Sequence, residues 1–183
     1  AGNLGGGGFM LVYIKEKQEI YYIDYRSSSP LNANIKDLFN TNLPKDYKKT
    51  DFDKSRFGYK ASAIPGTVAG LLEAHRNFGK LSLKEILEPV IKQASEGIKV
   101  SYDLNKAIES TPQLFNYPES RKIYFDNGKP LVKNSLMKRP DLAETLSHIS
   151  ANGHKGFYEG PTAKKIVEAM NANNGFMTLE DFK

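Results

Sequence analysis

Two short apolar segments near the N-terminus constrain the fold more than any other part of the sequence. Residues 9–14 and 20–25 are rich in β-branched and aromatic side chains, and the five residues between them are all polar. This pattern predicts two strands joined by a turn. Both strands carry apolar residues at consecutive positions, which is typical of a sheet covered on both faces. Because two strands alone are marginally stable, we expect their remaining partners to lie outside this sequence.

Four consecutive glycines, residues 5–8, lead directly into the first strand. A phosphate-binding glycine loop opens the N-terminus of a helix, whereas this run opens a strand. We therefore interpret the run as a tightly packed entry to the sheet. The sequence also contains no G-x-S-x-G nucleophile motif, no Walker loop and no dinucleotide-binding fingerprint.

Most of the remaining sequence predicts helices. Apolar periodicity, capping residues and helix stops place them at 32–40, 67–77 and 102–110, between Ser82 and Gly97, and after Pro140 and Pro161. Pro89 predicts a kink or a restart, because proline has no N–H and crowds the preceding turn. Residues 41–60 predict a long surface loop, and residues 122–132 a small hairpin or an ordered loop.

The predicted fold class is therefore α+β, an N-terminal strand hairpin followed by mainly helices. A length of 183 residues with 39% hydrophobic residues suffices for one core, so we expect a single domain over residues 1–183. It comprises sheet strands in 1–30, a loop region in 31–62 and a mainly helical part in 63–183. Thr178 and Asp181 form a helix-capping pattern just before the chain stops, so we expect this domain to be a piece of something longer.

Composition argues against several classes of function. The absence of cysteine excludes thiol catalysis, zinc–thiolate sites and disulfides. His75, His148 and His154 lack a metal-ligand spacing, so we predict no metal and no cofactor. The formal charge of +5 comes from interleaved acidic and basic residues, which argues against a nucleic-acid partner. The longest apolar run is far below the roughly 18 to 20 residues of a membrane span, so we predict no membrane segment.

Arg26 is the candidate binding residue. It follows the second strand and precedes Ser27, Ser28 and Ser29. An arginine at the end of a strand can offer its planar fork to a carboxylate, with serine hydroxyls beside it. The alternative is a surface salt bridge with Asp24 or another acid, and the residues alone leave both interpretations open.

Seven segments, in order and over essentially the whole chain, resemble one family. They are G-G-G-G-F-M from residue 5, I-D-Y-R from 23 with Pro30, A-I-P-G-T-V-A-G-L from 63, F-G-K-L from 78, G-I-K-V from 97, F-Y-E-G from 157 and G-F-M-T-L-E-D from 175. Together they look like the large subunit of γ-glutamyltranspeptidases. The P-G-T-V-A-G stretch is the most specific of them.

The resemblance implies a four-layer αββα N-terminal nucleophile hydrolase fold, shared by two subunits cut from one precursor. It implies that the full protein cleaves the γ-glutamyl amide of glutathione and passes the glutamyl group to water or to an amino acid or peptide acceptor. In this family the N-terminal threonine of the small subunit is the nucleophile. No threonine here lies in the family's T-T-H motif, so we expect no catalytic residue in this chain and no activity from it alone.

By the same resemblance, Arg26 matches the arginine that binds the α-carboxylate of the glutamyl substrate. Ser27 departs from the glutamate that the family usually has at the next position, which leaves the finer substrate choice open. Asp24 is expected to be structural. Related members that cleave cephalosporin side chains or poly-γ-glutamate stay as alternatives, as does a non-catalytic binding or scaffold module. Bacterial members imply a periplasmic or secreted location.

Overall fold

The computed structural model describes residues 3–38 and 56–183. The chain divides into two compact units, Ala1–Lys80 with Asn152–Lys183, and Leu81–Ala151. The first, here called unit 1, contains the N-terminal hairpin, and the second, unit 2, is mainly helical. A single domain over the whole chain stays a prediction.

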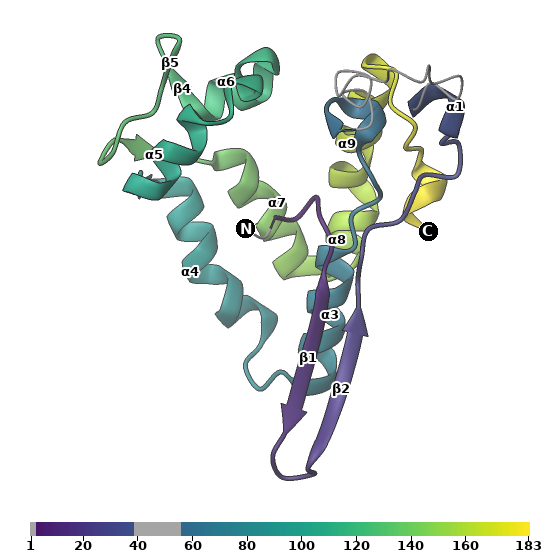
Figure 1. Ribbon diagram of the computed structural model, residues 1–183. Coiled ribbons are helices and arrows are strands. Elements are labelled where there is room, and N and C mark those ends of the chain that lie inside the picture. The colour runs from purple at the N-terminus through teal and green to yellow at the C-terminus, as the bar shows by residue number, and fades with distance from the viewer. Residues whose placement is uncertain (1–2, 39–55) are drawn as a thin grey trace, which may run out of the picture. The chain divides into compact units, whose positions relative to one another are not determined.

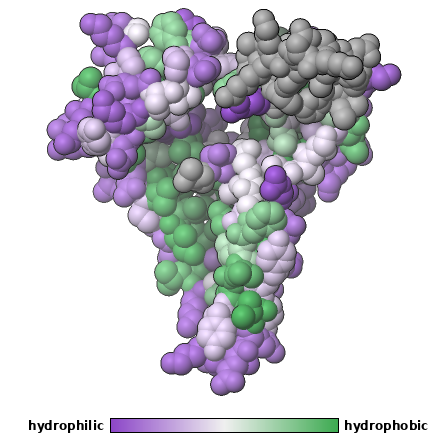
Figure 2. Space-filling model, in the orientation of Figure 1, coloured by the Kyte–Doolittle hydropathy of each residue, from purple (hydrophilic) through white to green (hydrophobic). Residues whose placement is uncertain are grey.

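The hairpin of unit 1 consists of β1, Phe9–Ile14, and β2, Glu19–Asp24, paired antiparallel from Phe9 opposite Asp24 to Ile14 opposite Glu19 (Figure 1). Both strands therefore lie within one residue of their predicted positions. Inward and outward side chains alternate along them, and Leu11 on the outward face is 73% exposed. Figure 2 shows hydrophobic side chains at the surface of the hairpin. Within the described residues, only one face of this two-stranded sheet is covered.

Helix α3, Thr67–Phe78, lies against β2 (Figure 1). The Tyr21 and Phe78 rings meet at its C-terminal end, with their centroids 5.0 Å apart. The helix ends where the Gly79 N–H donates to the His75 carbonyl at 2.7 Å. The sequence predicted this helix to within one residue.

The rest of unit 1 is built from short helices. These are α1, Ile35–Leu38, the 3-10 turn η2, Tyr59–Ala61, the helices α8, Lys155–Tyr158, and α9, Gly160–Ala172, and the 3-10 turn η4, Leu179–Phe182. The predicted helix at 32–40 is thus shorter, and its last two residues lie outside the described part, as does most of the predicted loop at 41–60. The core of the unit gathers apolar side chains from α3, α8, α9 and the C-terminal segment: Val68, Phe157, Tyr158, Ala163, Met170, Met177 and Phe182.

Unit 2 starts with α4, Leu83–Glu96. Ser82 and Glu85 form the predicted capping box, with the Glu85 N–H donating to the Ser82 hydroxyl at 3.2 Å. The helix continues through Pro89, so the predicted restart does not occur. It ends at Gly97, whose φ of 103° favours glycine.

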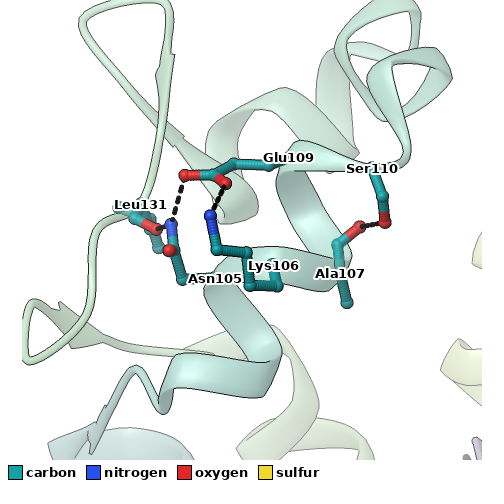
Figure 3. A network of polar contacts seen from close by, with 6 residues as sticks. All are labelled: Asn105, Lys106, Ala107, Glu109, Ser110 and Leu131. Carbon is teal, nitrogen blue, oxygen red and sulfur yellow. Dashed lines mark hydrogen bonds and ion pairs between the residues drawn. The ribbon is translucent and has the colours of Figure 1, made fainter.

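Two more helices of unit 2, α5, Tyr102–Glu109, and α7, Pro140–Asn152, were also predicted. Buried apolar residues of α4, α5 and α7, with one residue just before α5, form the core of the unit: Ala94, Val100, Ile108, Ala143, Leu146 and Ile149. Figure 3 shows how the buried amide of Asn105 joins α5 to the following loop, donating to the Leu131 carbonyl at 3.0 Å and to Glu109 at 3.1 Å. Glu109 also pairs with Lys106 at 2.8 Å.

The segment between α5 and α7 was only partly predicted. The sequence pattern predicted neither the 3-10 turn η3, Pro112–Asn116, nor α6, Pro118–Tyr124. The small hairpin is present as β4, Phe125–Asp126, and β5, Lys129–Pro130. Its two-residue turn, Asn127 and Gly128, has positive φ at both positions, as a tight hairpin of this type needs. A second short pair joins β3, Ile98–Lys99, to β6, Leu136–Met137.

Candidate functional site

Arg26 lies two residues past the end of β2, in unit 1. Its backbone N–H donates to Asp24 Oδ1 at 2.9 Å, and its guanidinium carbon lies 5.9 Å from the centre of the Phe9 ring. The side chain is exposed. Among the described residues no carboxylate forms an ion pair with the guanidinium. Asp24 thus contacts the Arg26 backbone rather than its charge, and no acid of the described residues occupies the fork of N–H donors.

Glycines hold the backbone on both sides of Arg26. A Cβ atom built at Gly66 would overlap the Tyr25 carbonyl oxygen, and one built at Gly70 would overlap the Tyr25 side chain. A Cβ atom at Gly7 would lie 2.6 Å from the Tyr25 carbonyl oxygen and would overlap the Ser27 nitrogen. Any side chain at these positions would push the strand end away. Segments distant in sequence therefore approach within backbone contact around Arg26.

Backbone hydrogen bonds stabilise the contact between the residues that lead into α3 and the segments on both sides of the hairpin. The N–H groups of Gly66 and Thr67 both donate to the Gly6 carbonyl at 2.9 Å, and the Ile64 N–H donates to the Ser28 carbonyl at 2.8 Å. The glycine run is therefore a tightly packed entry to the hairpin, as the sequence predicted. The P-G-T-V-A-G stretch is the start of α3, and it seats the strand end that carries Arg26.

Tyr158 supports the same turn from the opposite end of the chain. Its hydroxyl donates to the Pro65 carbonyl at 2.8 Å and accepts from the Ala69 N–H at 3.1 Å. The Tyr158 ring is 6% exposed and packs against the rings of His154 and Phe157. This burial raises the pKa of the Tyr158 hydroxyl, which keeps it a neutral donor.

Asp181 fixes the segment that follows Arg26. Its carboxylate accepts the Leu31 N–H at 2.7 Å and the N–H and hydroxyl of Thr178 at 2.7 and 2.9 Å. Partial burial opposes ionisation of this carboxylate, but the hydrogen bonds, first from Leu31 and then from Thr178, outweigh it and lower the pKa of Asp181. The predicted capping pattern is thus present, and it also anchors a loop 150 residues away.

In residues 3–38 and 56–183 no group of three or more His, Cys, Asp or Glu side chains could hold a metal ion. Within the same residues no helix is long and apolar enough to cross a membrane. The arrangement around Arg26 is suited to binding an anion, because a guanidinium without an ion-pair partner in the described part of the chain is presented on a tightly packed backbone with serine residues beside it.

Comparison with known proteins identifies the family. A family model described as gamma-glutamyltranspeptidase matches residues 1–183. The chain belongs to the γ-glutamyltranspeptidase family. It is 38% identical over 181 residues to a glutathione hydrolase proenzyme of Pseudomonas aeruginosa, and 36% identical over 183 residues to that of Escherichia coli. These alignments cover 99% of this chain but only 31% and 30% of the relatives, so the chain spans less than a third of their length.

Solved structures of the γ-glutamyltranspeptidase family agree. The Helicobacter pylori enzyme matches with a TM-score of 0.88 at 32% identity, covering 100% of this chain and 51% of the other. The Pseudomonas nitroreducens enzyme, solved with L-DON, matches with a TM-score of 0.83 at 37% identity, with the same coverage. The Bacillus anthracis transpeptidase CapD matches with a TM-score of 0.74 at 30% identity, covering 100% and 52%. The predicted N-terminal nucleophile hydrolase fold is confirmed.

Within this γ-glutamyltranspeptidase-family chain, the role of Arg26 stays a prediction. The sequence singled out Arg26 and the capping role of Asp181, but it missed Tyr158 and the bond from Asp181 to Leu31, although Tyr158 and Asp181 both lie in motifs that carried the resemblance. One further signal was available. Gly66 and Gly70 lie four residues apart and therefore on one face of a helix, which marks that face for a close backbone approach.

Proposed function

We propose that this chain supplies the glutamyl-binding part of a γ-glutamyltranspeptidase. The full protein hydrolyses the γ-glutamyl amide of glutathione, or transfers the glutamyl group to an amino acid or peptide. The observation that carries the proposal is the guanidinium of Arg26, which pairs with no carboxylate among the described residues and which a glycine-packed backbone holds at the strand end of a chain belonging to this family. Arg26 binds the α-carboxylate of the substrate by paired N–H donors.

The role of Arg26 is to place the reacting carbonyl. In a γ-glutamyl group, the α-carboxylate lies at the opposite end of a short flexible chain from the γ-carbonyl. Fixing the carboxylate removes the freedom of that chain and holds the carbonyl where a nucleophile can attack. The Phe9 ring, beside the guanidinium, limits the side-chain positions of Arg26. The aromatic ring also attracts the cation without competing for its N–H donors.

The nucleophile belongs to a second segment. None of the threonines in this chain lies in a T-T-H motif, so we propose that a threonine of a small subunit, released from the same precursor, attacks the carbonyl. The chain by itself then has no turnover. The word proenzyme in the names of the relatives supports processing of this kind. A periplasmic or secreted location is part of the same proposal.

Two substrates test the proposal in the full-length protein. One is γ-glutamyl p-nitroanilide, and the other is 4-aminobutyryl p-nitroanilide, which is the same molecule without the α-carboxylate. We expect the processed enzyme to have a much higher kcat/KM for the first, and the isolated chain of residues 1–183 to hydrolyse neither. The ratio of the two kcat/KM values, here called the carboxylate preference, should collapse in Arg26→Ala.

Each alternative gives a different result. A non-catalytic scaffold would hydrolyse neither anilide even as the full-length protein. An acylase acting on other side chains would show no carboxylate preference. Robust turnover by residues 1–183 alone would refute the proposed division of the site between two subunits.

A further inference from the structure

The N-terminus of α3 takes its caps from distant parts of the chain. Gly66 occupies the N-cap position, so no side chain there can accept a hydrogen bond. The N–H of Thr67 donates instead to Gly6, and the N–H of Ala69 to the Tyr158 hydroxyl. The first N–H groups of a helix have no partner within the helix and need such acceptors. The Tyr158 hydroxyl therefore caps the N-terminus of α3, although it lies 89 residues from Ala69 in the sequence.

The Tyr158 hydroxyl holds both sides of the turn that starts α3. It accepts from Ala69 in the first turn of the helix and donates to the carbonyl of Pro65, just before the helix. The ring cannot move aside easily, because it stacks on His154 with centroids 4.3 Å apart and meets Phe157 edge-on at 5.0 Å. The hydroxyl is thus a fixed point against which the start of α3 is placed.

The start of α3 in turn places the strand end. Gly66 and Gly70 bring the helix into direct contact with Tyr25, without room even for a methyl group between them. A close-packed contact of this kind transmits a shift rather than absorbing it. Arg26 is the next residue after Tyr25, so a movement of the α3 N-terminus changes where its guanidinium lies.

We propose that Tyr158 is a positioning residue of the glutamyl-binding site. Its hydroxyl fixes the start of α3, and through Tyr25 it fixes the position from which Arg26 meets the substrate carboxylate. Tyr158 itself touches no substrate. This inference rests on the proposed function of Arg26 and adds a second residue, 132 positions further along the chain, to the same recognition.

The test is Tyr158→Phe in the full-length precursor, which removes the hydroxyl and keeps the ring. We expect the carboxylate preference to fall by roughly 3- to 30-fold, mainly through a higher KM for the γ-glutamyl substrate, because small misplacements of a binding group are costly. Both substrates are assayed on one preparation, so the preference does not depend on the fraction of folded enzyme. In an Arg26→Ala background the same substitution should leave the remaining preference unchanged, since coupled residues are not additive.

The matched control is Asn105→Leu in unit 2, which leaves the Leu131 carbonyl without its buried donor. Like Tyr158→Phe, it should lower Tm, but it should leave the carboxylate preference unchanged. An unchanged preference in Tyr158→Phe, an equal loss in Asn105→Leu, or additivity with Arg26→Ala would overturn the positioning role. A Tyr158→Phe precursor that does not fold even at reduced temperature would also overturn it, because the hydroxyl would then hold the whole fold. If Arg26→Ala alone keeps the carboxylate preference, the result refutes the proposed function of Arg26 itself, whatever Tyr158→Phe shows.

Discussion

Replacement of Arg26 gives the most direct measurement of what this chain contributes. Arg26→Ala removes the guanidinium and leaves the glycine-packed backbone unchanged, because Gly7, Gly66 and Gly70 contact the main chain of residues 25–27 or the Tyr25 ring rather than the Arg26 side chain. The effect should therefore fall on substrate binding, with little change in the free energy of unfolding. Arg26→Lys keeps the charge but loses the planar fork, so its kcat/KM for the γ-glutamyl anilide should lie between the values of Arg26→Ala and the wild type.

The size of the expected loss depends on whether the Arg26 guanidinium already has a partner. In the described residues no acid competes for it, so the substrate carboxylate does not have to displace an ion pair. Losing a charge-assisted contact that bound substrate covers costs about 2 to 4 kcal/mol. At 1.4 kcal/mol for each factor of ten, kcat/KM for the γ-glutamyl anilide should fall about 30- to 700-fold. The value for the 4-aminobutyryl anilide should stay nearly constant, because that substrate has no carboxylate to lose.

The assay is release of p-nitroaniline over a range of substrate concentrations, with kcat and KM fitted separately. Arg76→Ala is the control, because Arg76 is also an exposed arginine of unit 1 but already pairs with Glu73 at 2.6 Å. It should change neither constant. An unchanged KM in Arg26→Ala, or an equal loss for both substrates, would refute the argument that Arg26 recognises the carboxylate.

Three further predictions concern stability. Gly70→Ala should lower the free energy of unfolding in urea by about 2 kcal/mol, because the overlap of the new methyl with Tyr25 outweighs the better helix propensity of alanine. Ser82→Ala should lower the free energy of unfolding by about 1 kcal/mol, because it removes the cap of α4. Glu85→Gln keeps a partner for the Ser82 N–H, so it should lower the free energy of unfolding by less in the same chemical denaturation experiment. Asp181 has a lowered pKa in the folded chain, so the stability that it adds should be complete above its ordinary pKa of 3.8 and disappear as the pH falls through its lower folded pKa. In Asp181→Asn, Tm should therefore fall less steeply as the pH is lowered from neutral to acid. An unchanged fall of Tm at acid pH would show that other carboxylates cause it.

Local signals predicted the elements whose stabilising interactions lie close together in sequence. The hairpin was predicted because its β-branched and aromatic residues flank a polar turn. The helices α3, α4, α5 and α7 were predicted because their apolar periods and stop signals are internal to each segment. The turn η3 and the helix α6 lack a clear apolar period, so only the folded chain revealed them. Of the kink or restart predicted at Pro89, the restart was wrong, since α4 accommodates the proline within one continuous helix.

The sequence by itself determined the family and the α+β class, and it singled out Arg26 as the candidate binding residue, because these depend on residue types in order along the chain. Only the tertiary structure decided how Arg26 is held. The Gly6 carbonyl, the Tyr158 hydroxyl and the Asp181 carboxylate reach the region of Arg26 from separate segments, and no local pattern encodes such partners. Only the tertiary structure also showed that Asp24 bonds to the Arg26 backbone and not to its guanidinium, because whether an arginine pairs with a neighbouring acid depends on where folding places both side chains.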